Sequence, residues 1–351
     1  MLTMTWTSDN LYCIIGSGEA DCTARLIWSV LEHGRPGEAA LLTRTECLWQ
    51  GRRLPAPAWP SWRETLEAYF RALEAQGCRR VVLALSPSQI AAGWARGLRC
   101  RAAVVGGLRE HDNTDALKGY LTGCCRLLVA NLDDSRVRTL AAQWGGPKLT
   151  YAEKRGEADL NARYLRLGRD RMTFDAVTDS AIARVSLALP GSYDFYMALA
   201  ALGCGLLEGY TLREGAAAVS AAPGVPGVLE LRRRADGPDE LIHASCTGPQ
   251  LEAALLAARR AGSGHVLLVL ALPPGGTDRR LRRIALQGAD WCALIPAAGE
   301  RPGGPDLSAA MRAARYRGEP EDIIVFAGRA NWDALLAQPQ VSVSAEHRDG
   351  A

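Results

Sequence analysis

A short loop near the start of the chain has the residue types of a phosphate-binding site. An apolar run at residues 11–15 is followed by Gly16-Ser17-Gly18, and a helix is expected from Thr23 to Leu31. Backbone N–H groups at such a strand–glycine–helix junction can bind phosphate, and a serine or threonine hydroxyl after them can bind the accompanying magnesium ion. Gly16, Ser17, Gly18 and Thr23 are therefore candidate cofactor-binding residues.

The charges in this loop do not suit a nucleotide. A working phosphate loop carries a lysine for the β- and γ-phosphates, whereas this sequence has Glu19-Ala20-Asp21 and no lysine at that point. Two carboxylates within a few ångström of a phosphate would repel it. A tight strand–helix turn without a ligand is the alternative interpretation of these residues.

The composition is that of a globular protein with more than one domain. The chain has 351 residues, of which 48% are hydrophobic and 23% charged, enough to bury two cores. Its net charge of +3, from 41 basic and 38 acidic side chains, gives no electrostatic reason to expect nucleic acid or an anionic membrane as partner.

The cysteines, the histidines and the apolar runs indicate a cytoplasmic protein without a bound metal. None of the 10 cysteines forms a CxxC pair, so reduced core thiols are expected rather than disulfides or a metal site. His243, His265 and His347 also lack the spacing of metal ligands. The chain begins without the pattern of a signal peptide. Its longest apolar run, residues 265–274, is too short for membrane insertion.

Short β-rich runs alternate with helical patterns along the chain, which is typical of a parallel sheet covered by helices. The segment between Tyr164 and Ser186 alternates instead, as antiparallel strands at a sheet edge do. Two prolines and two glycines at residues 222–227 predict a domain boundary. We therefore expect an α/β domain at 1–226 and a smaller Rossmann-like α/β domain at 227–351. The predicted elements are strands at 11–15, 81–85, 102–105, 127–130, 228–232, 266–271, 292–295 and 322–326, and helices at 23–31, 194–209, 212–220, 249–261 and 281–287.

Several motifs, taken in order, resemble those of the ATP-dependent Mur ligases of peptidoglycan synthesis, most closely the muramyl-tripeptide branch. They are GSGEADCTARLI after residue 15, NLDD at 131–134, LPGSYDFYMALAA at 189–201, PGVPGVLE at 223–230, GGTDRR at 275–280 and DIIVFAG at 322–328. The resemblance implies a P-loop-like central domain with a degenerate phosphate loop at 16–23, followed by the C-terminal domain of the family. It also implies ATP and magnesium as cofactors if any activity remains. By this resemblance Asp194, Asp278 and Arg279 are further candidate cofactor-binding residues.

The resemblance also shows which charged residues of the family are replaced. The lysine of the phosphate loop aligns with Ala20, and the glutamate that holds magnesium aligns with Ala84. An Asp-His pair of the family survives as Glu110-His111, and Lys118 lies close to the lysine that the family carbamylates. The uridine-nucleotide domain of the family is expected to be missing, because the phosphate-loop strand begins about ten residues into the chain.

Three hypotheses for function follow. The first is a degenerate pseudo-ligase of cell-wall metabolism that acts by binding a partner, such as another cell-wall enzyme, or a muramyl-peptide-like ligand. The second is an active amide ligase in which Lys118, Glu110 and His111 are catalytic. The third is a small-molecule binding module that uses the cleft between the two domains.

Overall fold

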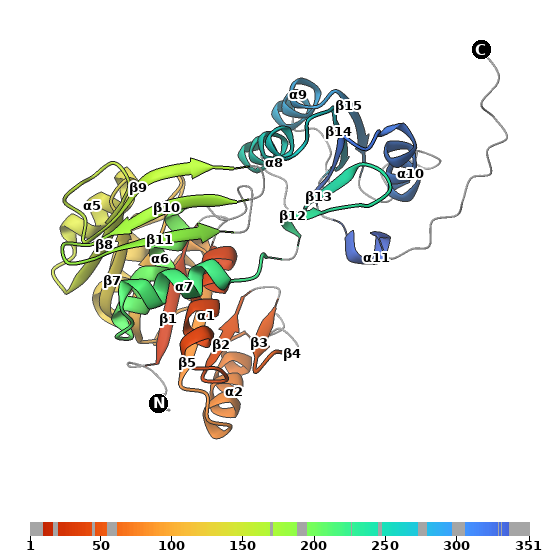
Figure 1. Ribbon diagram of the computed structural model, residues 1–351. Helices are drawn as coiled ribbons and strands as arrows, with labels where there is room; N and C mark the ends of the chain where they lie inside the picture. Colours follow the sequence, from red (N-terminus) through yellow and green to blue (C-terminus); the bar gives the residue numbers. More distant parts are fainter. Residues whose placement is uncertain are drawn as a thin grey trace, which may run out of the picture. The chain divides into compact units, whose positions relative to one another are not determined.

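The computed structural model describes residues 10–16, 20–43, 46–54, 62–168, 171–187, 195–225, 227–244, 248–272, 279–296, 306–328, 330 and 332–336. The chain divides into two compact units, Met1–Val225 and Pro226–Ala351. Each unit has its own sheet covered by its own helices (Figure 1).

The first unit is built on one large mixed sheet. Its strands are β1 (Leu11–Ile15), β2 (Ala39–Leu42), β3 (Cys47–Trp49), β4 (Arg52–Leu54), β5 (Arg80–Leu85), β6 (Cys100–Val105), β7 (Cys125–Asn131), β8 (Lys148–Ala152), β9 (Leu160–Leu167), β10 (Met172–Val177) and β11 (Ile182–Leu187). Its helices are α1 (Ala20–Gly34), α2 (Trp62–Ala75), α3 (Pro87–Ala91), α4 (Thr114–Cys124), α5 (Ser135–Gln143), α6 (Phe195–Leu207) and α7 (Leu212–Ala221).

The strand order in this sheet is β11-β10-β9-β8-β7-β6-β1-β5-β2-β3-β4. Neighbours from β9 across to β2 are parallel, and the two ends of the sheet are antiparallel. The predicted α/β class is therefore confirmed, as is the antiparallel edge predicted between Tyr164 and Ser186. The short strands β2 to β4 and β8 were not predicted, because runs of three to five residues carry little periodicity.

The central strands are buried on both faces, which accounts for their continuous apolar runs. Along β1, Ile14 packs into the core beneath α1, α6 and α7, and Ile15 packs into the core beneath α2 to α5. The helix after β1 thus covers one face of the sheet, and the helix after the adjacent β6 covers the other. Loops that leave neighbouring parallel strands in opposite directions open a crevice at the carboxyl ends of those strands.

The second unit is a smaller sheet of the same kind. Its strands, in the order β12-β13-β16-β14-β15, are parallel except for β12. The elements are β12 (Val228–Arg232), β13 (Asp239–His243), α8 (Gly248–Ala261), β14 (Val266–Ala271), α9 (Arg279–Gly288), β15 (Trp291–Ile295), α10 (Leu307–Arg317), β16 (Ile323–Gly328) and α11 (Trp332–Leu336). Helices α8 and α9 cover one face and α10 covers the other, the arrangement expected of a Rossmann-like unit.

Two expectations from the sequence concern membrane insertion and the state of the cysteines. Among the described residues, no helix is long and apolar enough to cross a membrane. The nine described cysteines carry free thiols, and Cys246 lies outside the described residues.

Candidate functional site

A cavity of about 300 Å³ lies at the crevice between the carboxyl ends of β1, β6 and β7. Its described lining comes from the end of β1, the start of α1 and the loops after β6 and β7. The lining residues are Ile14, Ile15, Gly16, Ala20, Thr23, Gly106, Gly107, Leu108, Arg109, Asn131 and Asp134. Open α/β sheets bind ligands at this position, because the crevice exposes backbone groups at helix and loop ends. The cavity is therefore the candidate site of the first unit.

The wall formed by the loop after β6 is fixed by the side chain of Asn131, which is 5% exposed. The Nδ2 of Asn131 donates to the carbonyl of Gly106 at 3.0 Å, and its Oδ1 accepts from the N–H of Asp133 at 3.0 Å. Both ends of the amide are thus used within the protein. A buried amide satisfied in this way positions a loop and has little capacity left for a ligand.

The two aspartates that follow are also occupied with backbone groups. The Oδ1 of Asp134 accepts from the N–H groups of Arg136 and Val137 at 2.9 Å and caps α5, while its Oδ2 accepts from the N–H of Leu108 at 3.3 Å. The Oδ2 of Asp133 accepts from the N–H of Glu153 at 2.6 Å. The NLDD motif therefore holds the loops after β6, β7 and β8 together.

The charge that remains around the cavity is small. Arg109 is the one cation and Asp134 the one carboxylate among the described lining residues. Ala20 occupies the first position of α1 on the cavity wall, and Ala84 is buried in β5. In the described part of the chain, no group of acidic, histidine or cysteine side chains is arranged to hold a metal ion. The described lining residues thus include no lysine, and their one carboxylate accepts hydrogen bonds from backbone N–H groups, whereas a magnesium–nucleotide complex is bound by an amine at the phosphates and by carboxylates at the metal.

Comparisons with known proteins give the same family in sequence and in structure. No protein-family model matches the chain. A UDP-N-acetylmuramoyl-L-alanyl-D-glutamate–2,6-diaminopimelate ligase of Clostridium botulinum is 31% identical over 157 residues, covering 44% of this chain and 32% of the relative. A UDP-N-acetylmuramyl-tripeptide synthetase of Deinococcus radiodurans is 26% identical over 323 residues, covering 81% of this chain and 65% of the relative. The chain thus spans less than two thirds of the length of these relatives.

Solved structures of similar fold match this chain over about nine tenths of its length. A UDP-N-acetylmuramoyl-L-alanyl-D-glutamate–2,6-diaminopimelate ligase superposes with a TM-score of 0.69 at 19% identity, covering 91% of this chain and 72% of that one. The folylpolyglutamate synthetase of Lactobacillus casei gives a TM-score of 0.70 at 14% identity, covering 92% and 88%. The chain resembles the Mur ligases and has their fold. The resemblance predicted from the motifs is confirmed.

The candidate site residues named from the sequence lie in four different situations. Gly16 and Thr23 line the cavity, and the N–H of Gly16 donates to the carbonyl of Leu85 at 3.4 Å. Glu110, His111 and Lys118 are exposed, in the turn after β6 and on α4, and none of them is among the described lining residues. Arg279 is exposed at the first position of α9 in the second unit. The remaining candidates, Ser17, Gly18, Asp194 and Asp278, lie outside the described residues.

Arg109 and the pair Gly106-Gly107 were not named as site residues from the sequence. Their signal was present, because two glycines directly after a buried strand often mark a close approach of the backbone.

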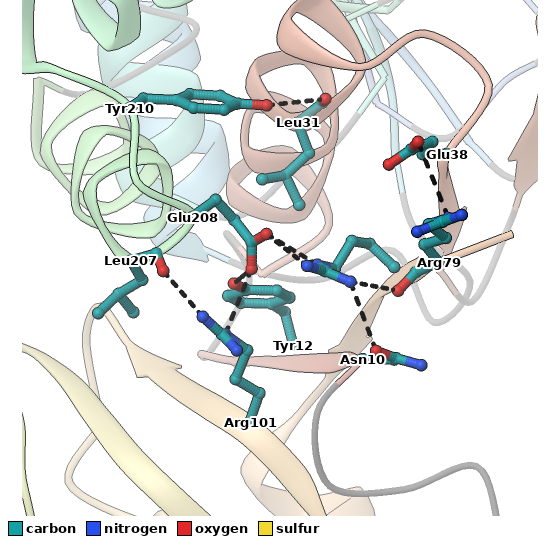
Figure 2. A network of polar contacts seen from close by, with 10 residues as sticks. Asn10, Tyr12, Leu31, Glu38, Arg79, Arg101, Leu207, Glu208 and Tyr210 are labelled. Carbon is teal, nitrogen blue, oxygen red and sulfur yellow. Dashed lines mark hydrogen bonds and ion pairs between the residues drawn. The ribbon is translucent and has the colours of Figure 1, made fainter.

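A second polar cluster lies at the opposite edge of the sheet, at the amino ends of β1, β5 and β6 (Figure 2). Its centre is Glu208, which follows α6 and has a side chain that is 5% exposed. The carboxylate pairs with Arg80 at 2.7 Å and with Arg101 at 3.2 Å, and it accepts a hydrogen bond from the hydroxyl of Tyr12. We call these four residues the Glu208 cluster.

The Glu208 cluster is explained by packing. Burial by itself would raise the pKa of Glu208, but the hydrogen bonds from Arg80 and Tyr12 and the charges of Arg80 and Arg101 outweigh it and hold the pKa below its usual value. Arg101 also donates to the carbonyl of Leu207 at 2.8 Å, at the end of α6. The cluster therefore ties the carboxyl end of α6 to three parallel strands, and it lies at the edge away from the cavity.

Proposed function

We propose that this chain is a Mur-ligase-like protein of cell-wall metabolism that no longer carries out ATP chemistry and acts by binding a ligand or a partner. The observation that carries the proposal is the composition of the cavity wall. The Mur ligase scaffold around the cavity is retained, with Asn131 and Asp134 holding its loops. The amine and the free carboxylates that ATP and magnesium need are absent from its described lining.

The proposed ligand places a polar part with a single negative charge against this wall. The glycine carbonyls and amides of the wall can hydrogen-bond a polar group, and Arg109 is an exposed cation at the rim for which no ion pair is found among the described residues. A muramyl-peptide-like molecule has amides and a carboxylate that suit such a wall. A triphosphate with its magnesium ion does not, since only one cation is available for several charges.

The first test is a thermal shift with Mg-ATP. A ligand at about 100 times its Kd stabilises a protein by about 2.7 kcal/mol, which for a unit of this size raises the Tm by about 5–10 °C. We expect no shift for the natural chain with millimolar Mg-ATP. We also expect no ATP-dependent phosphate release when a muramyl peptide and an amino acid are added. Turnover under these conditions would refute the proposal and favour the active ligase.

A matched variant tests whether the missing lysine decides the outcome. The double variant Glu19→Gly/Ala20→Lys restores the final glycine and the lysine that the Mur ligase loop has at these two positions. If the cavity wall is retained, this variant should gain a thermal shift with Mg-ATP that the natural chain lacks. Lys118→Ala is the control for the active-ligase hypothesis. An active ligase would lose its ATP-dependent phosphate release in this variant, whereas a binding protein does not need that lysine.

A further inference from the structure

The exposed face of α8 has an unusual sequence for a solvent-facing surface. Three residues spaced four apart, about one helical turn each, form a single stripe on this face: Glu252, Leu256 and Arg260. Leu256, at the centre, is 52% exposed. The apolar side chains on the other faces of α8, such as Leu251 and Leu255, are buried in the core of the second unit. An exposed leucine between two opposite charges is thus the outer surface of an otherwise ordinary amphipathic helix.

The two charges of this stripe lie equally far from Leu256 and have opposite sign. At 1.5 Å per residue they are about 12 Å apart along the helix, too far to pair with each other. Neither Glu252 nor Arg260 has an ion pair among the described residues of the structure. The neighbouring Arg259 differs, since it pairs with Asp290 at 2.7 Å. Glu252 and Arg260 are therefore available for a partner.

A groove lies beside the exposed leucine, between α8 and α9. Its cavity is about 310 Å³, and it is lined by Glu252, Leu255, Leu256, Arg259, Ile284, Gln287 and Gly288. The floor is apolar and the rim is charged. Gly288 lines the groove, and a Cβ at this position would lie 2.5 Å from Cδ1 of Leu255, so α8 and α9 pack closely here. A leucine side chain fits a space of this size and character.

We propose that a second copy of this chain binds this surface, with α8 of each copy antiparallel to α8 of the other. A two-fold axis at Leu256 places Glu252 of each copy opposite Arg260 of the other, because both residues lie one turn from the axis. Each Leu256 then enters the groove of the other copy. A surface that carries both the projecting group and its receptor, with charges of opposite sign on either side, is self-complementary in the way that a two-fold dimer requires. Because one helix and one groove make a small contact, the dimer is a weak one.

The test is sedimentation equilibrium of the full chain from about 1 to about 100 µM, the range in which weak dimers dissociate. We expect a monomer–dimer equilibrium whose Kd rises with added salt. Leu256→Asp should raise this Kd at least about tenfold, because it places a charge in an apolar groove. Leu286→Asp is the matched control: Leu286 is more exposed, at 65%, and does not line the groove, so this variant should dimerise like the natural chain.

A charge swap decides the geometry. Glu252→Arg and Arg260→Glu should each weaken the dimer several-fold, since each replaces two attractions with two repulsions. The double variant should restore the natural Kd to within about threefold, because the pairs are re-formed with their signs exchanged. A monomer at every concentration would overturn the proposal. So would an equal effect of Leu256→Asp and Leu286→Asp, or a double variant that remains as weak as the single ones.

Discussion

His243 is a buried polar residue in apolar surroundings. It lies at the end of β13, is 4% exposed, and neither ring nitrogen has a hydrogen-bond partner among the residues that the structure describes. Burial disfavours the charged imidazolium and lowers the pKa of His243 to about 4. Unpartnered buried nitrogens cost free energy even in the neutral ring. The residue therefore lowers the stability of the second unit, and the cost grows as the pH falls.

The pH dependence of this cost has a definite sign. The unfolded chain binds a proton at His243 below about pH 6.5, whereas the folded chain does so only below about pH 4. Stability is therefore lost as the pH falls from 6.5 toward 4, by about 2 kcal/mol at pH 5. We expect His243→Leu to remove this part of the acid sensitivity and to be at least as stable as the natural chain at pH 7.5. Urea unfolding of both proteins at the two pH values measures the difference. An equal loss in the two proteins would contradict the assignment to His243.

At the scale of elements, the loops around the cavity are positioned by helix caps and strand ends. Asp134 caps α5 and also holds the loop after β6 through Leu108. Asp134 lies between the end of β7 and the start of α5, so one side chain fixes both the helix and a wall of the cavity. The NLDD motif is accounted for by this architecture without any nucleotide.

Replacement of Asp134 separates an architectural role from a chemical one. Asp134→Ala should destabilise the first unit by about 1–2 kcal/mol, because it removes the cap of α5. Asp134→Asn should cost less, about 0.5–1 kcal/mol, because asparagine keeps the cap but its NH₂ group cannot accept from the N–H of Leu108 as Oδ2 does. Urea denaturation of the two variants gives the comparison. If the asparagine variant were as unstable as the alanine variant, the negative charge itself would be required and the cap would not explain the residue.

At the scale of the whole molecule, each unit has its own hydrophobic cores. Two core clusters flank the sheet of the first unit, and two others flank the sheet of the second. The Glu208 cluster also belongs to one unit, since all its residues lie between 12 and 208 in the first unit. Units with separate cores are able to unfold separately.

We therefore expect two transitions in scanning calorimetry of the full chain. Glu208→Gln leaves Arg80 and Arg101 facing a neutral group and should cost about 2–3 kcal/mol, lowering one transition by roughly 5 °C or more and leaving the other in place. Tyr12→Phe removes only a hydroxyl donor and should lower the same transition by less. His243→Leu at pH 5 should move the second transition alone. A single transition that shifts with variants of both units would contradict this expectation.

The fold class, most of the central strands and the likeness to the Mur ligases could be predicted from the sequence. These depend on local patterns, since a buried parallel strand reads as a continuous apolar run and a helix has its own periodicity. Gly16 and Thr23, which the sequence offered as cofactor-binding candidates, lie on the cavity wall. The short strands β2 to β4 were not predicted from the sequence, because pairing with neighbouring strands rather than local propensity stabilises them.

Only the tertiary structure decided which side chains meet. Arg109 follows β6, whereas Asn131 and Asp134 lie at the end of β7 and in the loop after it, and they converge because β6 and β7 are adjacent and parallel. The unpartnered nitrogens of His243 and the charged stripe around Leu256 likewise depend on what the rest of the chain covers. Burial and proximity across the fold are properties of the packed molecule. The sequence therefore predicted a phosphate loop without its lysine, and the structure showed how Asn131 and Asp134 hold the loops beside it.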